Sequence, residues 1–288
     1  MNQPAYRRLA YEATHATSNR VLREAMTGEF LGFGHALSGL RQSGIVSDDM
    51  TVQAAIASIT RWMLQHYRSE GLYKNAIANE LFLRRHRDRQ ATLLTEVAVG
   101  RSIADCVIVN GRGTVYEVKT ELDNPDKLRR QFDDYYRAFS AVYLVTHEKA
   151  AARYMNVLTE FPAGLIVLDD TGRLRTRSEA VCSHDRLSIP VMMKTLRKPE
   201  YTRVAESIHG GPLQTRPTDH FAQCMSIAES ISPVEFASLY EGQLRTRRAR
   251  QVALIRARPF RNVRHQLLKL DPTEVELRRV SAWMAGGI

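Results

Sequence analysis

The sequence predicts an α/β protein with a mixed sheet flanked by helices and with mainly helical additions at both ends. Two observations support this. The middle of the chain changes from apolar residues at helical spacing to short runs rich in β-branched residues. Those runs are followed by alternating helices and strands, which indicate crossovers between parallel strands. We expect a helical region over 1–70, a core over 71–180 and a helical, arginine-rich region over 181–288.

The predicted core begins with one helix and a meander of three strands. Residues 72–89 carry apolar side chains at helical spacing. Residues 92–99 and 103–109 are apolar and rich in β-branched side chains, which is typical of strands. The tetrapeptide NGRG at 110–113 predicts a hairpin turn, and 114–120 follows as the third strand. These three strands are expected to pair antiparallel.

The second half of the core alternates helices and strands. Asn124 suits a helix N-cap and Pro125 suits the first helical turn, so a helix is expected from this point. A buried strand is predicted over 141–147, a helix over 147–161 and a further strand over 163–170. The resulting order is helix, three strands, helix, strand, helix, strand.

The C-terminal region contains two marked helix starts. Ser232 and Glu235 have the spacing of a capping box, with a proline at the first helical position between them. Asp271 is expected to cap a second helix in the same way. Pro259 is expected to end the first of these helices, because the residue before a proline disfavours helical geometry.

Composition narrows the class of protein. The 288 residues include 41 Lys and Arg against 31 Asp and Glu, and a net charge of +10 favours a polyanionic partner. The sequence contains no run of eighteen apolar residues, so no membrane span is predicted. The N-terminus lacks the apolar region of a secretory signal, and we therefore expect a cytoplasmic protein. The cysteines, Cys106, Cys182 and Cys224, are too few and too dispersed for a CxxC zinc pair or an iron–sulfur cluster.

The predicted hairpin brings charged residues together. Glu117 and Lys119 are two apart on one strand and therefore share a face. With the turn at 110–113, Asp105 falls within one residue of facing Glu117. Two carboxylates this close repel each other, so a cation, a shared proton or Lys119 must offset the repulsion. Hard oxygen ligands of this kind suit Mg²⁺ or Mn²⁺.

Glu80 is a candidate for the same site. It lies on the predicted helix before the sheet, among apolar neighbours, and a carboxylate on the sheet-facing side would reach the metal. The alternative is an exposed helix residue paired with Arg84 at i+4. For Glu117 and Lys119 the alternative is an ion pair on a solvated strand face. Glu96 is another carboxylate near this sheet, for which a surface position is the simpler interpretation.

These residues fit a known pattern. The pattern consists of Ala104-Asp105 and, after an eleven-residue gap, Glu117-Val118-Lys119. Glu80 precedes it, and Gln131 and Tyr135 follow it at i, i+4 spacing. Over about residues 72–170 the chain resembles the PD-(D/E)XK nuclease superfamily. The Gln131 and Tyr135 pair resembles the Q-x-x-x-Y motif of one branch of this superfamily, which includes phage-type exonucleases and the nuclease domains of recombination helicases. Ala104 stands where the literal motif has proline.

The resemblance implies a restriction-endonuclease-like αβββαβ core and a metal-dependent nuclease, acting on DNA, in a bacterial or phage setting. It implies that Mg²⁺ or Mn²⁺ is held by Asp105, Glu117, the carbonyl of Val118, and Glu80. Lys119 would orient or deprotonate the attacking water. Gln131 and Tyr135 would contact the phosphate backbone or support the ligands. The alternatives are a nucleic-acid-binding or regulatory protein that no longer cleaves, and an RNA nuclease.

A dense basic run lies near the C-terminus, with no acidic residue between Gly242 and Arg264. As a helix face it would bind phosphates, and the candidate residues for nucleic-acid binding are Arg245, Arg248 and Arg256. The alternatives are a solvated helix or packing on the acidic flank of another domain. The complete run is Arg245, Arg247, Arg248, Arg250, Arg256, Arg258, Arg261 and Arg264.

Overall fold

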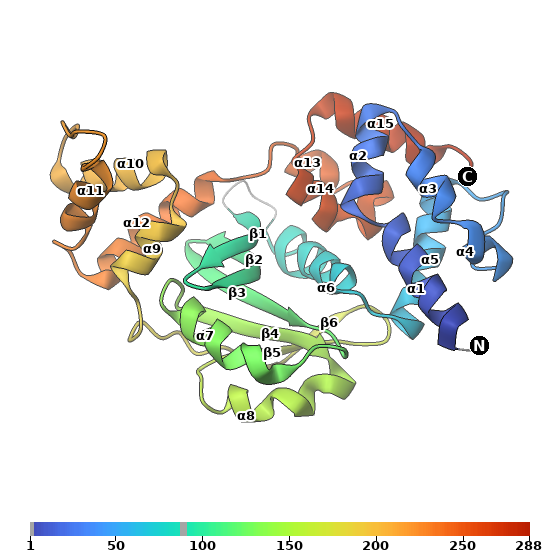
Figure 1. Cartoon of the computed structure of the whole chain (residues 1–288), viewed down its shortest axis with the longest axis horizontal. Helices are drawn as coiled ribbons and strands as arrows, with labels where there is room; N and C mark the ends of the chain where they lie inside the picture. Colours follow the sequence, from blue (N-terminus) through green and yellow to red (C-terminus); the bar gives the residue numbers. More distant parts are fainter. Residues whose placement is uncertain (1–2, 87–90) are drawn as a thin grey trace. The chain divides into compact units, whose positions relative to one another are not determined.

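The computed structural model describes residues 3–86 and 91–288, and the chain forms two compact units (Figure 1). Unit 1 consists of Met1–Arg85, Leu168–Leu174 and Ala249–Ile288, and unit 2 of His86–Val167 and Arg175–Arg248. Helices beyond residue 181 therefore belong to both units. In the described part of the chain, no helix is both long and apolar enough to cross a membrane.

Unit 1 is helical and joins segments from both ends of the chain. Helix α15 contacts α2, and a β-bridge pairs Thr51 with Gly287. The helix predicted over 72–89 is observed as α6 followed by a π-helical segment, η1, and its last residues lie outside the described part. The elements are α1 (Gln3–Ala16), α2 (Asn19–Thr27), α3 (Leu31–His35), α4 (Ser38–Gln42), α5 (Val52–His66), α6 (Glu70–Ala76), η1 (Ile77–Leu83), α13 (Val252–Ile255), the 3₁₀ turn η4 (Arg258–Asn262), α14 (Arg264–Leu270) and α15 (Glu274–Ala285).

The start of α15 corrects one prediction. Its N-cap is Thr273, which forms a capping box with Glu276, and not Asp271. Asp271 instead ends α14 with a left-handed backbone, φ 48°. Its carboxylate is already engaged, because Oδ1 accepts from the Arg250 backbone N–H at 2.7 Å and Oδ2 from the Arg250 Nε at 3.0 Å.

The sheet belongs to unit 2, apart from the ends of β5 and β6 beside the Leu168–Leu174 turn. Its six strands follow chain order; β1–β2 and β2–β3 are antiparallel and β3–β4 is parallel. The predicted α/β class and mixed sheet are confirmed. The sequence missed β6, because its side chains are mostly exposed and lack an apolar pattern. The strands are β1 (Thr92–Val99), β2 (Ser102–Asn110), β3 (Arg112–Lys119), β4 (Ala141–His147), β5 (Gly164–Leu168) and β6 (Leu174–Ser178).

Helices pack on one face of this sheet. Asn124 caps the 3₁₀ turn η2 (Pro125–Lys127), which leads into α7 (Leu128–Tyr136), as predicted. The next predicted helix begins as the 3₁₀ segment η3 (Glu148–Tyr154) and continues as α8 (Met155–Leu158). The remaining helices of unit 2 are α9 (Ile189–Thr195), α10 (Lys198–His209), α11 (His220–Ala228) and α12 (Pro233–Thr246).

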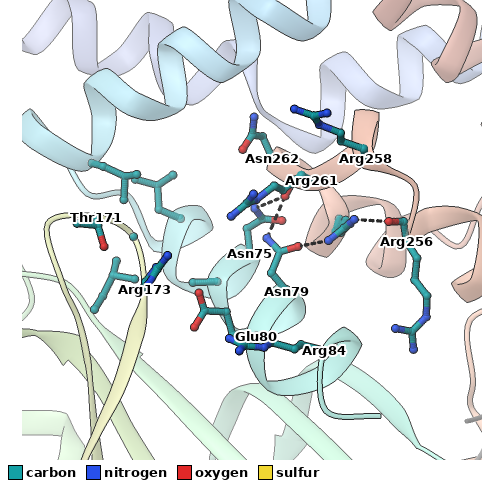
Figure 2. A pocket seen from close by; sticks show the side chains of 16 residues that line it. Asn75, Asn79, Glu80, Arg84, Thr171, Arg173, Arg256, Arg258, Arg261 and Asn262 are labelled. Atoms are coloured by element: carbon teal, nitrogen blue, oxygen red, sulfur yellow. Dashed lines mark hydrogen bonds between the residues drawn. The ribbon is translucent and has the colours of Figure 1, made fainter. Parts of the chain in front are cut away.

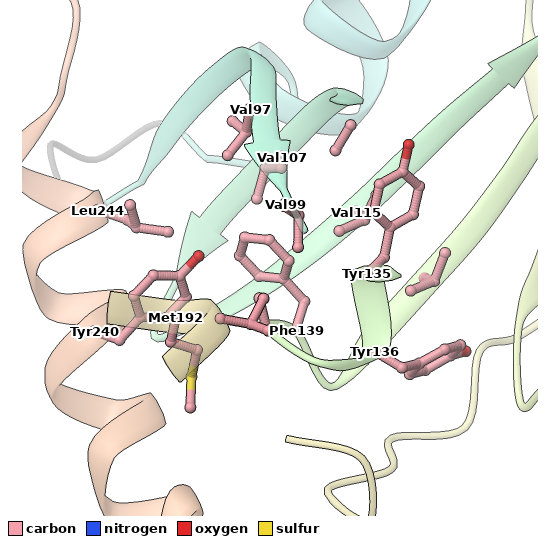
Figure 3. Packing of buried hydrophobic residues seen from close by; sticks show 14 of the residues in the cluster. Val97, Val99, Val107, Val115, Tyr135, Tyr136, Phe139, Met192, Tyr240 and Leu244 are labelled. Carbon is pink, nitrogen blue, oxygen red and sulfur yellow. The ribbon is translucent and has the colours of Figure 1, made fainter. Parts of the chain in front are cut away.

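The core of unit 2 lies between the sheet and α7, α9 and α12 (Figure 3). Sheet valines such as Val107 and Val115 meet Tyr135 and Phe139 from the α7 region, and Tyr240 from α12. All five are almost completely buried. This packing fixes the rotation of α7 over β3 and therefore decides which α7 side chains face Glu117.

Helix α12 begins as predicted and ends earlier than predicted. Ser232 and Glu235 form the expected capping box. The helix ends at Thr246, and Pro259 lies within η4 instead of ending α12. The chain leaves the helix at Arg247, whose Nε donates to the buried Glu200 at 2.7 Å.

Candidate functional site

The β2–β3 hairpin places Asp105 beside Glu117. Gly111, with φ 72°, closes the turn, and Cys106 pairs with Tyr116. Continuing that register by one residue sets Asp105 opposite Glu117. Asp105 Oδ2 accepts a hydrogen bond from the Val118 backbone N–H at 2.9 Å. The spacing expected from the sequence is therefore observed, and the Asp105 carboxylate is fixed against β3.

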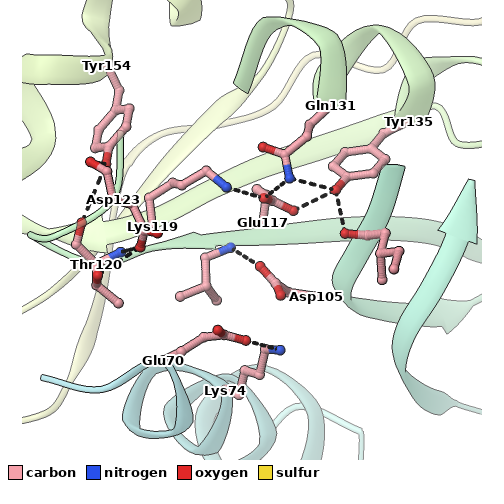
Figure 4. A network of polar contacts seen from close by, with 12 residues as sticks. Glu70, Lys74, Asp105, Glu117, Lys119, Thr120, Asp123, Gln131, Tyr135 and Tyr154 are labelled. Atoms are coloured by element: carbon pink, nitrogen blue, oxygen red, sulfur yellow. Dashed lines mark hydrogen bonds and ion pairs between the residues drawn. The ribbon is translucent and has the colours of Figure 1, made fainter. Parts of the chain in front are cut away.

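Glu117 is the centre of a buried polar network (Figure 4). Its side chain lies on the core face of β3 and is only 1% exposed. Lys119 Nζ and Gln131 Nε2 both donate to Glu117 Oε1 at 2.5 Å, and the Tyr135 hydroxyl lies 2.7 Å from Oε2. The structure thus joins four of the predicted residues by direct contacts and places the fifth, Asp105, beside them.

Burial changes the acid–base properties of this network. Desolvation raises the pKa of Glu117 to about 7, with a further increase from the negative charge of Asp105, and Lys119 opposes both effects. Burial and the Glu117 charge also raise the pKa of Tyr135 well above its usual value. Tyr135 therefore remains a protonated donor at neutral pH.

The Tyr135 hydroxyl has two acceptors for one proton. Besides Glu117 Oε2, the carbonyl of Ile103 lies 2.8 Å from it. A hydroxyl donates one hydrogen bond, so the two cannot be satisfied together while Glu117 is ionised. A proton on Glu117 resolves this, because Glu117 then donates to Tyr135 and Tyr135 donates to Ile103. The direction of the Tyr135–Glu117 hydrogen bond therefore depends on whether Glu117 carries a proton.

The donor set fits a hard divalent cation. Gln131 uses its Nε2 on Glu117, and its amide oxygen is buried without a hydrogen-bond partner in the described chain. An orphaned buried oxygen is costly unless water or an ion reaches it. The carboxylates of Asp105 and Glu117 are hard oxygen ligands of the type that Mg²⁺ and Mn²⁺ prefer. No preformed group of three acidic, histidine or cysteine side chains is found among the described residues.

Glu96 continues the acidic row across the hairpin sheet. In β1 its neighbours Thr95 and Val97 pair with Cys106 and Ala104, which places Glu96 opposite Asp105. It is exposed and has φ 55°, a left-handed conformation that costs a residue with a side chain roughly 1–3 kcal/mol. The distortion of β1 thus coincides with the position next to the candidate site.

Glu80 is not joined to this network by the described contacts. It belongs to unit 1, where its Oε2 accepts from the Leu174 backbone N–H at 3.2 Å and its side chain lines a cavity. The alternative pairing with Arg84 is not observed among the described ion pairs. The metal-binding role of Glu80 stays a prediction.

The C-terminal arginines do not form one helix face, which corrects the interpretation of that run. Arg245 is exposed in the last turn of α12 and Arg248 follows that helix, whereas Arg256 lies between α13 and η4 in unit 1. Arg247 and Arg250 pair with acidic residues, Glu200 and Asp271. Arg247 and Arg250 are therefore bound to acidic residues in two different parts of the chain.

Asp134 is a supporting residue that the sequence did not reveal. It is buried on α7, and its Oδ2 accepts from the Ser102 hydroxyl at 2.7 Å and from the Arg101 backbone N–H at 3.2 Å. Gly100 makes room for this contact, because a Cβ there would lie 2.4 Å from Asp134 Oδ1. The sequence feature that could have pointed to Asp134 is its position between Gln131 and Tyr135, on the helix that covers the site.

Fold and site together define an α/β protein with a mixed six-stranded sheet and a buried Glu–Lys–Gln–Tyr network on its third strand. The chain belongs to the family described as Bacteriophage P4 protein cII, whose family model matches residues 63–270. The match covers all the residues of the network. Comparisons with curated proteins and with solved structures found no match.

Proposed function

We propose that this protein is a metal-dependent nuclease that hydrolyses phosphodiester bonds, in DNA in preference to RNA. The observation that carries the proposal is the buried carboxylate of Glu117, held by Lys119, Gln131 and Tyr135 beside Asp105. Asp105 is half-buried beside the fully buried Glu117, and the single ammonium of Lys119 offsets only one of the two negative charges, so a divalent cation would complete the charge balance. The resemblance to PD-(D/E)XK nucleases assigns such a group of residues to phosphodiester hydrolysis.

Each residue has a defined role in this proposal. Mg²⁺ or Mn²⁺ would be held by Asp105, Glu117 and the carbonyl of Val118, all of which belong to unit 2. When bound, the cation lowers the pKa of a water ligand and neutralises charge on the phosphate. Lys119, which donates to Glu117 as an ammonium, would orient the attacking water and stabilise charge on the phosphate oxygens.

Gln131 and Tyr135 act on the position of Glu117. Their donors contact both of its oxygens, at 2.5 and 2.7 Å, so the carboxylate cannot rotate freely. A fixed carboxylate avoids the reorganisation that a flexible ligand requires during the reaction. The core contacts of Tyr135 hold the α7 side chains in position beside Glu117.

The basic net charge supports a nucleic-acid substrate, and the name of the matching family is compatible with a phage or bacterial setting. We place the reaction in the cytoplasm. The preference for DNA rests on the resemblance to PD-(D/E)XK nucleases, and an RNA substrate is the variation that the same site would allow.

The test is cleavage of linear duplex, circular duplex and single-stranded DNA and of RNA, with Mg²⁺, Mn²⁺ or EDTA. We expect cutting with either metal and none in EDTA. Glu117→Ala and Lys119→Ala should each abolish it, while Asp133→Ala, which changes an exposed acidic residue of α7 outside the network, should retain it. Cutting that survives both site variants would contradict the proposal; strand binding without any cutting would favour a non-catalytic nucleic-acid-binding protein.

A further inference from the structure

Unit 1 contains a strongly basic cavity of about 690 Å³ that the candidate nuclease site does not use. Its wall is formed by α6 and η1, the turn between β5 and β6, and the segment from Arg256 to Arg264 (Figure 2). Six lining residues are arginines, and Glu80 is the only acidic lining residue in the described chain. The arginines are Arg84, Arg173, Arg256, Arg258, Arg261 and Arg264.

The wall is held in place by its own amides. Asn75 and Asn79 each donate from Nδ2 to the carbonyl of Arg261 at 2.9 Å. Arg264 donates to Asn79 Oδ1 at 2.8 Å and to the carbonyl of Ile255 at 3.1 Å. These contacts fix η4 against η1, so the cavity is a built feature of unit 1.

Four of the arginines are not used in that framework. Arg84, Arg173, Arg258 and Arg261 are exposed, and no hydrogen bond or ion pair of their guanidinium groups is found among the described residues. The one carboxylate in the cavity, Glu80, accepts from a backbone N–H. The positive charges are therefore not balanced within the cavity.

The charges of neighbouring arginines act on Arg264, the half-buried member of the group. Burial lowers the pKa of Arg264, and the charges of Arg261 and Arg256 lower it further. Several guanidinium groups held together in this way raise the local concentration of anions. Guanidinium groups also bind phosphate oxygens in a bidentate geometry that a lysine ammonium lacks.

We propose that this cavity binds consecutive phosphate groups of a nucleic-acid strand. Its volume lies within the roughly 300–1,000 Å³ of ordinary ligand pockets, which is room for more than one phosphate. The Asn75 and Asn79 amides are occupied by the framework, so the groups left to contact a strand are mainly guanidinium groups, which bind phosphate oxygens. The choice of nucleic acid, as opposed to a free polyphosphate of the same chemistry, rests on the proposed function.

The test is strand binding by the full chain in EDTA, where no hydrolysis occurs. The probes are a fluorescent 20-nucleotide single strand and the corresponding duplex, and anisotropy gives Kd at several salt concentrations. The cavity variant is Arg258→Ala/Arg261→Ala. The matched control is Arg7→Ala/Arg23→Ala, which removes two exposed arginines of unit 1 outside the cavity.

We expect the cavity variant to weaken binding at least about tenfold and to reduce the slope of log Kd against log salt by about 1.4 for a single strand or about 1.8 for a duplex, as for two lost phosphate contacts. The control should change Kd less than about twofold, as a general charge effect. Equal weakening in both variants would overturn the proposal. A second cavity variant, Arg84→Gln/Arg173→Gln, must show the same loss, and unchanged thermal unfolding must accompany it.

Two further outcomes separate the possible ligands and functions. If inorganic triphosphate stabilises the wild type but not the cavity variant, while strand binding is equal in both, the cavity binds small phosphates and the proposal fails. Because binding is measured without metal, a protein that binds strands through the cavity but never cuts would refute the nuclease and retain this inference. A protein that cuts strands but binds them equally well with and without the cavity arginines would refute only the proposed role of the cavity.

Discussion

Tyr135 and Tyr136 are adjacent, both almost completely buried, and differ in what their hydroxyls do. The Tyr135 hydroxyl contacts Glu117 and Ile103, whereas the Tyr136 hydroxyl has no partner in the described chain. Tyr135→Phe should therefore cost about 1–2 kcal/mol of unfolding free energy. Tyr136→Phe should leave stability unchanged or raise it, because an unsatisfied buried group is removed.

Chemical denaturation of the two variants checks this pair, and cleavage provides a second readout. If the proposed site is correct, Tyr135→Phe should also lower the cleavage rate, since Glu117 loses one of its donors, while Tyr136→Phe should not. Equal stability losses in both variants would contradict the network described for Glu117.

His265 gives unit 1 a defined response to pH. It is buried, its Nε2 has no hydrogen-bond partner in the described chain, and burial together with the charges of Lys74 and Lys269 lowers its pKa to about 3. The folded pKa lies below the ordinary value of 6.5, so protons bind the unfolded state preferentially. Stability should therefore fall as pH decreases from about 6.5, by about 1.4 kcal/mol per pH unit, down to about pH 3.

The variant His265→Leu isolates this contribution. Denaturation of wild type and variant at pH 7.5 and pH 4.5 should show a smaller acid loss in the variant, by about 2–3 kcal/mol. The same loss in both proteins would mean that other groups cause the acid sensitivity.

At the residue scale, spacing predicted a large part of the candidate site. Two-residue periodicity placed Glu117 and Lys119 on one face, and four-residue periodicity did the same for Gln131 and Tyr135. The role of Asp134 and the orphaned oxygen of Gln131 could not be predicted, because both depend on the rotation of α7 over the sheet. That rotation is set by packing contacts between distant parts of the chain.

Two glycines test how the elements of unit 2 are joined. Gly113 on β3 donates its N–H to Glu241 of α12 at 2.7 Å, and a Cβ there would lie 2.6 Å from the Phe139 ring. Gly113→Ala should cost about 1–3 kcal/mol through overpacking. Gly242 lies within α12 with open space around its Cβ position, so Gly242→Ala should stabilise by about 0.5–1 kcal/mol.

Thermal unfolding of both variants measures the difference. The expected signs are opposite, although the two glycines undergo the same chemical change. A stabilised Gly113→Ala protein would show that Gly113 and the Phe139 ring are not in the close contact described.

Elements with a strong local signal were predicted well. The strands β1 to β5 have apolar, β-branched runs, and the capping box of α12 depends on residues three apart. Strand β6 lacks such a run because its side chains face solvent. Asp271 was assigned to the wrong helix end because its partner, Arg250, is twenty-one residues away.

At the scale of the whole molecule, the two units are discontinuous in sequence. Unit 1 joins the first 85 residues with the last forty and with a short turn inside the sheet region. Local patterns predicted helices at both ends of the chain but not that α2 and α15 contact each other. The basic cavity was missed for the same reason, since Arg84, Arg173 and Arg258 come from three separate segments.

The central claim is that Asp105 and Glu117 bind a divalent cation, and Mn²⁺ binding measured by calorimetry tests it without knowledge of the substrate. The proteins to compare are wild type, Asp105→Asn/Glu117→Gln, and Glu241→Gln, which changes another partly buried carboxylate of unit 2 with a raised pKa. We predict Mn²⁺ binding by wild type and Glu241→Gln that is lost in the double variant. Identical binding in all three proteins would contradict the account.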